Sequence, residues 1–372
     1  MKFLVCGMVF LCSFCLTATA QEPFRILFYN TENLFDCRHD SLKNDVEFLP
    51  DGNRHWSFYR FRDKIYKLSK VIVAAGTPVV PDLVGLCEVE NDSCLIHLTR
   101  YSPLREAGYR YVMTHSPDLR GIDVALLYQR GTFKVLGHRE IRVPSEQLSC
   151  RPTRNILHVA GRLITGQILD VFVCHQPSRS GGEKASEPHR LLAAKTLKEA
   201  VDSVRLVRRA ESPAHPEANI VIMGDFNDYS RNRSIREVLG AQKPHPPYHA
   251  QHLYDVLSVQ KGGTYRYKGE WGLLDHFILS GNLLVDDGQL PLFEESRQRK
   301  EEEPPVNQRG VFHQNAYLTS PRQARILKFP FLLEEDDRYG GMTPKRTYHG
   351  WKYKGGFSDH LPICLDLLMQ AE

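Results

Sequence analysis

The sequence lacks the glycine-rich loops that mark the common nucleotide-binding folds. Its 372 residues contain no Gly-x-x-x-x-Gly-Lys-Ser/Thr loop and no Gly-x-Gly-x-x-Gly fingerprint. Nucleoside triphosphate hydrolysis and dinucleotide chemistry therefore lose most of their support, because both use such loops to bind phosphate groups. A Gly-x-Ser-x-Gly elbow is also missing, which excludes the usual α/β-hydrolase arrangement.

Cysteine is scarce and poorly spaced for binding a metal. Beyond residue 20 no Cys-x-x-Cys pair occurs among six cysteines, so a structural zinc site is not expected. An oxidising compartment would permit disulfides, but six cysteines allow about 15 complete pairings and the sequence does not choose among them. Cys87 and Cys174 lie in apolar runs, where buried free thiols are at least as common as disulfides.

The chain has little excess of charge of either sign. Its 48 Lys and Arg residues against 44 Asp and Glu give +4 with histidine neutral. That surplus is too small to imply tight binding of nucleic acid and too small to exclude a polyanionic substrate. Hydrophobic residues make up 42% and charged residues 25%, a balance that excludes a disordered or collagenous chain.

Residues 1–20 have the pattern of a signal peptide. Lys2 precedes an almost wholly apolar run from Phe3 to Leu16, and Ala18-Thr19-Ala20 gives a small-x-small cleavage site ahead of Gln21. The apolar run is too short for a comfortable membrane span. We therefore expect an exported protein, periplasmic or extracellular, with an uncleaved N-terminal anchor as the alternative.

Short apolar runs predict strands along almost the whole mature chain. They are Phe24–Tyr29, Asp82–Cys87, Tyr109–Met113, Asp123–Tyr128, Ile156–Leu163, Ile168–Cys174, Ile220–Met223, Leu274–Leu279 and Leu361–Leu367. Two longer stretches have helical periodicity: Phe61–Ile72, which is followed by Gly76, and Glu187–Arg209. Strands outnumber helices, so the pattern favours an α/β or α+β sandwich of mixed sheets.

The mature chain, residues 21–372, is expected to form a single domain. It contains no internal repeat and no Gly/Ser linker that would divide it. Residues 281–350 differ from the rest, because they include the charged run Arg297–Glu303 and have little periodic apolar pattern. We interpret them as a long insertion in a core that resumes near Phe357; a solvated surface segment is its simplest explanation.

Polar side chains stand at the ends of six of the apolar runs. They occur in Asn30-Thr31-Glu32-Asn33, at Glu88, at His175, in Gly224-Asp225-Phe226-Asn227, at Asp275-His276 and in Ser358-Asp359-His360. Active sites of layered folds are often built from such strand ends. One such residue would mean little, because Asp and Asn also cap helices and begin turns. Six together predict one shared rim.

The residue types at these ends indicate metal-assisted phosphate chemistry. Carboxylates and carboxamides are hard oxygen ligands that suit Mg²⁺, Mn²⁺ or Ca²⁺ better than zinc. Imidazoles beside such a metal suit activation of water and stabilisation of a charged phosphoryl group.

The order of these motifs resembles the endonuclease/exonuclease/phosphatase superfamily of metal-dependent phosphoesterases. The matching segments are Tyr29–Phe35, Gly85–Asn91, Arg120–Ala125, Gly224–Asn227, Leu274–Leu279 and Ser358–Pro362. They span essentially the whole mature chain. The resemblance implies a DNase I-like four-layer α/β sandwich, in which two mixed central sheets are flanked by helices.

The resemblance also implies roles for individual residues. Glu88 is the expected principal metal ligand, with Asn30 and Asp359 completing the site. His360 is the expected acid/base or phosphate-contacting imidazole, oriented by Asp275. Further predicted catalytic residues are Asp225 and Asn227, which position water or polarise phosphate, and His175, a second phosphate-facing imidazole. Glu32 stands where some members place another acidic ligand.

Two neighbouring features have simpler interpretations. His276 is expected to be structural, because adjacent residues on a strand point to opposite faces. The loop Arg179–Gly182 either grips phosphate oxygens or forms a turn that leads into a helix, and the sequence leaves both open.

Taken together, the motifs predict a divalent-metal-dependent phosphodiester hydrolase in which water attacks phosphorus in line. Nucleic acid is the leading substrate. The alternatives are a phosphomonoesterase or a lipid or sugar phosphodiesterase of the same fold, and a non-catalytic binding module that retains it. We expect no stable membrane insertion after signal cleavage and no obligate protein partner.

Overall fold

The computed structural model describes residues 23–148, 151–290 and 317–369. The predicted signal peptide, Cys150 and the charged run 297–303 lie outside the described residues. Each of the five described cysteines is a free thiol, and four of them are buried. Within the described ranges, no helix combines the length and the apolar character needed to cross a membrane.

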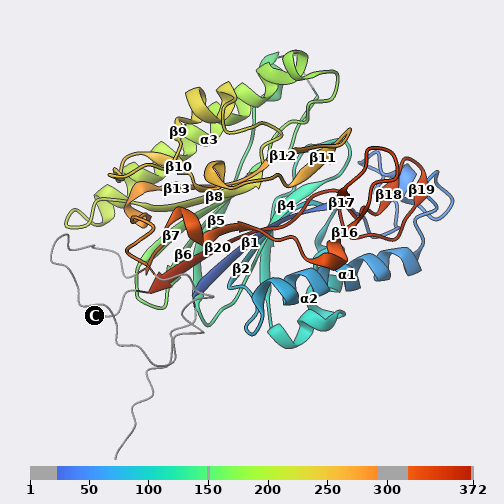
Figure 1. Ribbon diagram of the computed structural model, residues 1–372, viewed down its shortest axis with the longest axis horizontal. Helices are drawn as coiled ribbons and strands as arrows, with labels where there is room; N and C mark the ends of the chain where they lie inside the picture. The colour runs from blue at the N-terminus through green and yellow to red at the C-terminus, as the bar shows by residue number, and fades with distance from the viewer. Residues whose placement is uncertain (1–22, 149–150, 291–316, 370–372) are drawn as a thin grey trace, which may run out of the picture.

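Two seven-stranded mixed sheets form the centre of the molecule (Figure 1). In the first sheet the order is β14-β20-β1-β2-β4-β3, and β15 also pairs with β20. Its strands are β1 (Phe24–Leu34), β2 (Leu83–Val89), β3 (Arg110–Met113), β4 (Asp123–Tyr128), β14 (Tyr317–Leu318), β15 (Ala324–Ile326) and β20 (Ile363–Met369). The parallel pair β1–β2 sits among antiparallel neighbours, which makes the sheet mixed.

The second sheet has the order β5-β6-β7-β8-β13-β10-β9. Its strands are β5 (Phe133–Ile141), β6 (Ile156–Leu163), β7 (Ile168–His175), β8 (Asn219–Asp225), β9 (Ala241–Gln242), β10 (Leu253–Asp255) and β13 (Asp275–Ser280). Its central pair β7–β8 is parallel, and β13 joins β8 in antiparallel register with Asp275 opposite Asp225.

Helices cover the outer faces of both sheets (Figure 1). Helices α1 (Phe58–Gly76) and α2 (Asp92–Arg100) lie on the first sheet, and the long helix α3 (Glu183–Glu211) lies on the second. Each helix buries one apolar stripe, as amphipathic periodicity requires; in α1 this stripe includes Phe61, Ile65, Leu68 and Ile72. The predicted α/β class, a sandwich of two mixed sheets between helices, is confirmed.

Three apolar cores separate the four layers. One lies between the first sheet and helices α1 and α2, the second lies between the two sheets, and the third lies under α3. Strands buried on both faces read as continuous apolar runs, and this is why the sequence predicted β1, β2, β4, β6, β7, β8, β13 and β20 close to their observed positions.

The segment predicted as an insertion contributes in part to the core sheet. Its strands β14 and β15 pair with β20. Other parts of residues 260–353 form three small hairpins: β11 (Tyr265–Tyr267) with β12 (Glu270–Gly272), β16 (Leu333–Glu335) with β17 (Met342–Pro344), and β18 (Tyr348–His349) with β19 (Lys352–Tyr353). These hairpins lie together beyond one end of the sheets (Figure 1).

Candidate active site

Strand ends from both sheets converge at one rim. Strands β1 and β2 of the first sheet and β7, β8 and β13 of the second supply it, together with the loop before β20. The predicted residues at these positions are Asn30, Glu88, His175, Asp225, Asp275, Asp359 and His360. Residues more than 300 positions apart are thereby neighbours, as the prediction of one shared rim requires.

Asp225 lies at the centre of this group. Asn30 Nδ2 donates a hydrogen bond to Asp225 Oδ2 at 3.1 Å and so joins the two sheets. The Nε2 atoms of His175 and His360 each lie 3.7 Å from the same oxygen. The second oxygen, Oδ1, accepts a hydrogen bond from the backbone N–H of Asn227 at 2.9 Å. The side chain of Asn227 turns away from Asp225 and donates to the carbonyl of Gln176 at 3.1 Å.

His360 and Asp275 form a buried imidazole–carboxylate pair. Nδ1 of His360 lies 2.7 Å from Oδ2 of Asp275. Burial alone would lower the pKa of His360, but the charges of Asp275 and Asp225 outweigh it and hold that pKa well above its usual value. The ring is therefore an imidazolium near neutral pH. Tyr265 packs against it, with ring centroids 4.9 Å apart.

His175 is in the opposite protonation state. Burial lowers its pKa well below the usual value, and the positive charges of Arg154, Arg120 and His360 lower it further. Burial also raises the pKa of Asp225 to about 7, against the attraction of the imidazolium. The rim thus places a neutral imidazole and a charged imidazolium each 3.7 Å from one oxygen of a weakly acidic carboxyl group.

Glu88 is the more accessible carboxylate. Its side chain is 13% exposed, against 2% for Asp225. Oε2 accepts a hydrogen bond from the backbone N–H of Asn33 at 2.9 Å. Oε1 lies 3.1 Å from the guanidinium of Arg120 and 3.8 Å from Nε2 of His175.

Left-handed backbone conformations gather at this rim. Glu32, Asn33, Glu88 and Asn227 have φ values of 50°, 59°, 61° and 50°, a region that residues other than glycine rarely occupy. The β1–β2 register shifts between Asn30 and Leu34, so a bulge re-aims these side chains. Strain of this kind is commonly retained at functional sites.

Gly224 and Arg179 fix the loop that carries Asp225. A Cβ atom on Gly224 would lie 2.3 Å from the carbonyl oxygen of Cys174, so only glycine lets β8 approach β7 here. The guanidinium of Arg179 donates to the carbonyl of Asn227 at 2.7 Å and to Asp228 at 3.1 Å. In this structure the Arg179–Gly182 loop therefore matches the alternative of a turn that leads into a helix, α3.

Asp359 lies beside two cations that the sequence analysis did not identify. Its Oδ2 is 2.6 Å from the guanidinium of Arg346, and the buried ammonium of Lys64 also stabilises its charge. Burial alone would raise the pKa of Asp359, but His360 and Arg346 outweigh it and lower that pKa. Glu32 lies nearby, and burial raises its pKa to about 7.

Lys64 was predictable and Arg346 was not. Lys64 is three residues after Phe61 and four before Leu68, on the apolar face of a predicted helix, where a lone cation needs a buried partner. Arg346 lies in the segment predicted as an insertion, without periodic pattern. His276, predicted to be structural, contacts Asp255 at 2.8 Å and the carbonyl of Asp228 at 2.9 Å, away from the rim.

The oxygen donors of the rim fit a hard divalent cation. Glu88 and Asp359 offer carboxylates and Asn30 an amide, which suit Mg²⁺, Mn²⁺ or Ca²⁺. Among the described residues, one group of three places its carboxylate and imidazole ligand atoms within 4.8 Å of one another: Asp225, Asp275 and His360. In that group the imidazole of His360 and the carboxylate of Asp275 already contact each other, with 2.7 Å between Nδ1 and Oδ2. The resemblance implies Glu88, Asn30 and Asp359 as the metal ligands, and all three lie at this rim.

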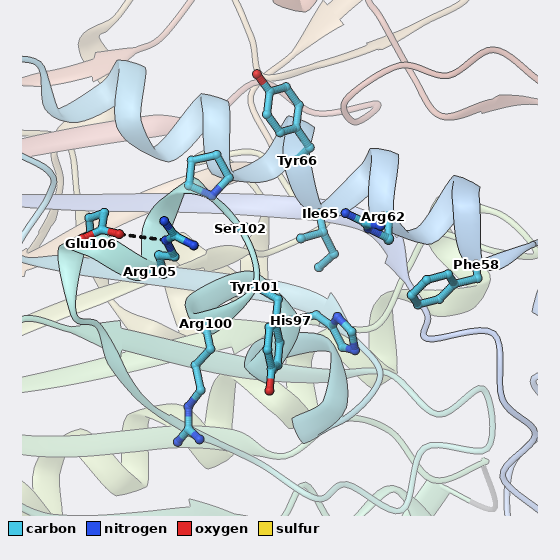
Figure 2. Close-up of a pocket in the computed structure, with 11 residues that line it drawn as sticks. Phe58, Arg62, Ile65, Tyr66, His97, Arg100, Tyr101, Ser102, Arg105 and Glu106 are labelled. Atoms are coloured by element: carbon cyan, nitrogen blue, oxygen red, sulfur yellow. Dashed lines mark hydrogen bonds and ion pairs between the residues drawn. The ribbon is translucent and has the colours of Figure 1, made fainter.

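A separate hollow of about 800 Å³ lies between α1 and α2 (Figure 2). Phe58, Tyr66, His97 and Tyr101 line it, with the guanidinium groups of arginines at its edges. No predicted site residue lines it, so this hollow is not the candidate active site.

Two mixed sheets packed between layers of helices are the arrangement of the DNase I-like phosphoesterase fold. The chain matches the sequence profile of the Endonuclease/Exonuclease/phosphatase family over residues 25–296 and 308–369. It belongs to that family. No curated protein matches the chain in sequence.

Solved structures with the same fold cover almost the whole chain. An endonuclease/exonuclease/phosphatase family protein from Bacteroides thetaiotaomicron is 12% identical, with a TM-score of 0.52 over 94% of this chain and 100% of that one. A mannosyl-6-phosphatase from the same species is 13% identical, with a TM-score of 0.51 over 93% and 100%. A functionally unknown conserved protein from Enterococcus faecalis is 14% identical, also with a TM-score of 0.51 over 93% and 100%. At these identities the likeness concerns the fold.

Proposed function

We propose that this chain is a divalent-metal-dependent phosphodiester hydrolase, with nucleic acid as its leading substrate. The observation that supports this most strongly is the His360–Asp275 pair beside Asp225, with the more accessible Glu88 near the same nitrogen of His175 that Asp225 approaches. An imidazolium, a carboxyl group of pKa about 7 and an accessible carboxylate are the groups that hydrolysis of a phosphoester needs.

Each residue has a defined task in this proposal. Glu88, Asn30 and Asp359 hold the metal, which when bound supplies positive charge to a phosphate oxygen. Asp225 orients the attacking water and accepts its proton, and the backbone N–H of Asn227 keeps Asp225 in place. His360, held by Asp275, stabilises negative charge on the phosphoryl group. His175, which is neutral, donates or accepts a hydrogen bond without adding charge.

A phosphomonoester is the second candidate substrate. Arg120 lies 3.1 Å from Glu88 and Arg346 lies 2.6 Å from Asp359, so guanidinium groups stand on two sides of the carboxylates. Guanidinium groups at both places would favour the doubly charged terminal phosphate over the singly charged diester. A phosphatase would therefore use the same residues.

The test is hydrolysis by the purified mature chain, residues 21–372. Bis(p-nitrophenyl) phosphate, p-nitrophenyl phosphate and supercoiled plasmid are each incubated with Mg²⁺, with Mn²⁺ and with EDTA. We expect turnover of the diester and nicking of the plasmid, both abolished by EDTA. Turnover of the monoester alone would replace the diester proposal with the phosphatase. Absence of turnover on all three substrates would contradict the proposed function.

A further inference from the structure

Arg346 stands on a stretch of backbone that is fixed from both sides. It lies between β17 and β18, in one of the segments outside the two central sheets. The backbone N–H of Lys345 donates to Leu332 at 2.7 Å, and that of Thr347 donates to Glu32 Oε2 at 2.6 Å. A Cβ atom on Gly356 would lie 2.2 Å from the carbonyl oxygen of Arg346, so the backbone near Gly356 packs directly against the backbone of Arg346. The guanidinium is therefore carried by a rigid support.

The guanidinium of Arg346 is hydrogen-bonded to one carboxylate and lies near a second one. One terminal nitrogen is 2.6 Å from Asp359 Oδ2, and Nε is 3.8 Å from Glu32 Oε1, beyond hydrogen-bond distance. Nε is buried and has no hydrogen-bond partner. The side chain as a whole is 34% exposed. An arginine that is held by one carboxylate and is one-third exposed is suited to receive an anion.

The position of Arg346 places that anion site beside the catalytic groups. Asp359 precedes His360 directly in the chain, and Tyr265, which packs on the His360 ring, also interacts with Arg346. Arg120 occupies the corresponding place beside Glu88, where it also donates to Asn33 Oδ1 at 2.7 Å. The two arginines therefore border the carboxylates from different sides.

Arg346 differs in exposure from Lys64, the other cation beside Glu32 and Asp359. Lys64, fully buried, already donates to Thr347 and to the carbonyl of Phe357 and lies close enough to stabilise both Glu32 and Asp359. Arg346 is the second cation beside these two carboxylates and, unlike Lys64, it reaches solvent, with 34% of its side chain exposed. Arginine presents a planar fork that matches the oxygens of a phosphoryl group.

We propose that Arg346 binds non-bridging oxygens of the substrate's phosphoryl group and so sets the affinity of the site for phosphate esters. This inference rests on the proposed function for the identity of the substrate. Because a terminal phosphate carries more charge than a diester, the contribution of Arg346 is larger for a monoester than for a diester.

The experiment compares Arg346→Gln and Arg346→Lys with the wild type. Arg338→Gln is the matched control, because Arg338 is an exposed arginine of the β16–β17 hairpin that stacks on Tyr339. Binding of inorganic phosphate is measured by calorimetry in EDTA, and KM and kcat are measured with both p-nitrophenyl substrates in Mg²⁺. Melting temperatures establish that each variant is folded.

We expect Arg346→Gln to weaken phosphate binding and raise KM by about tenfold, the loss of one charged hydrogen-bonding group, with a smaller change in kcat. Arg346→Lys keeps the charge but not the fork, so its KM lies between the two, and Arg338→Gln matches the wild type. Unchanged phosphate affinity and KM with a reduced kcat would overturn the inference and assign Arg346 to holding Asp359. If Arg346→Gln does not fold, a wild-type KM and phosphate affinity in Arg346→Lys would overturn it equally.

The two proposals fail in different ways. Absence of hydrolysis by the wild type contradicts the proposed function, whereas phosphate binding in EDTA still tests Arg346. Hydrolysis that survives with an unaltered KM in Arg346→Gln contradicts the role of Arg346 alone.

Discussion

His360 has carboxylates near both ring nitrogens, which sets its charge. Nδ1 lies 2.7 Å from Asp275, and Nε2 lies 3.7 Å from Asp225. In a buried position an unpaired imidazolium would be costly, so these two carboxylates are what keep the proton on the ring. The neighbouring carboxylates of Asp275 and Asp225 therefore determine the protonation state of His360.

Replacing Asp275 by Asn should lower the pKa of His360. Removing the nearer carboxylate leaves burial, which favours the neutral ring, opposed only by Asp225 and Asp359. Titration of the ring by nuclear magnetic resonance measures the shift directly, and we expect activity to fall by about 10²–10⁴-fold with it. The control is Asp92→Asn, which removes an exposed carboxylate from His115. An unchanged His360 titration in folded Asp275→Asn would contradict this explanation.

At the residue scale, the structure brings the predicted residues together where motifs and strand ends coincide. Asn30, Glu88, His175, Asp225, Asp275 and His360 lie together because each ends a buried strand or immediately precedes one. Arg346 and Tyr265 could not be predicted in the same way. They reach the rim from short hairpins, whose positions depend on tertiary contacts such as Thr347 to Glu32 and not on local pattern.

The buried carboxylate of Asp170 connects strands β6 and β7 of the second sheet with helix α3. It lies on β7, 2.8 Å from His158 of β6 and 2.7 Å from Arg208 near the end of α3. Burial alone would raise the pKa of Asp170, but the hydrogen bonds from His158 and Arg208 outweigh it and lower that pKa. The ion pair between Asp170 and Arg208 thus fixes the C-terminal part of α3 against the second sheet.

Asp170→Asn should destabilise the fold near neutral pH by about 3 kcal/mol, the usual cost of leaving one partner of a buried ion pair alone. Folding lowers the pKa of Asp170. The carboxylate therefore stabilises the folded state fully above the pKa that Asp170 has in the unfolded chain, and this stabilisation is lost as the pH falls through the pKa of the folded state. The difference from wild type should therefore shrink below about pH 4. Urea unfolding at neutral and acid pH measures it.

The control for this prediction is Asp202→Asn. Asp202 forms an ion pair with Lys198 on the exposed side of α3, and its side chain is 47% exposed. Such surface pairs contribute less than about 1 kcal/mol. An equal effect of Asp202→Asn and Asp170→Asn would contradict the account of the buried pair.

At the element scale, burial decided which strands and helices could be predicted. Strand β5 was missed because its residues are mostly exposed, with Lys134, His138 and Arg139 among them. Helix α2 was missed because nine residues are too few for a clear helical period, although Asn91 caps it by accepting from the N–H of Cys94 at 3.1 Å. Helix α3 begins at Glu183, earlier than the predicted Glu187, because Gly182 ends the preceding turn.

At the scale of the whole molecule, the two ends of the described chain meet in the first sheet. Strand β1 near the start of the described residues pairs with β20 near their end, with Phe24 opposite Leu367. Both sheets therefore depend on long-range contacts, and both contribute side chains to the rim. A site divided between two sheets holds its shape only while the sandwich is intact.

We also propose that the protein is exported, with residues 1–20 removed. Expression of the full chain in a bacterium, followed by mass spectrometry of the secreted and periplasmic fractions, tests this. The expected product begins at Gln21, after the Ala18-Thr19-Ala20 site. A protein that remains in the cytoplasm with its N-terminus intact would contradict the proposal.

The most direct test of the central claim, that this rim is a metal-dependent hydrolytic site, is Glu88→Gln. Hydrolysis of bis(p-nitrophenyl) phosphate in Mg²⁺ is compared with the melting temperature, and Glu106→Gln, at an exposed ion pair with Arg105, is the control. We predict that Glu88→Gln lowers kcat/KM by at least about 10²-fold, because the principal carboxylate for the metal is lost. Its melting temperature should stay near that of the wild type, since Glu88 lies at the accessible rim. Wild-type turnover by folded Glu88→Gln would contradict the assignment of the site.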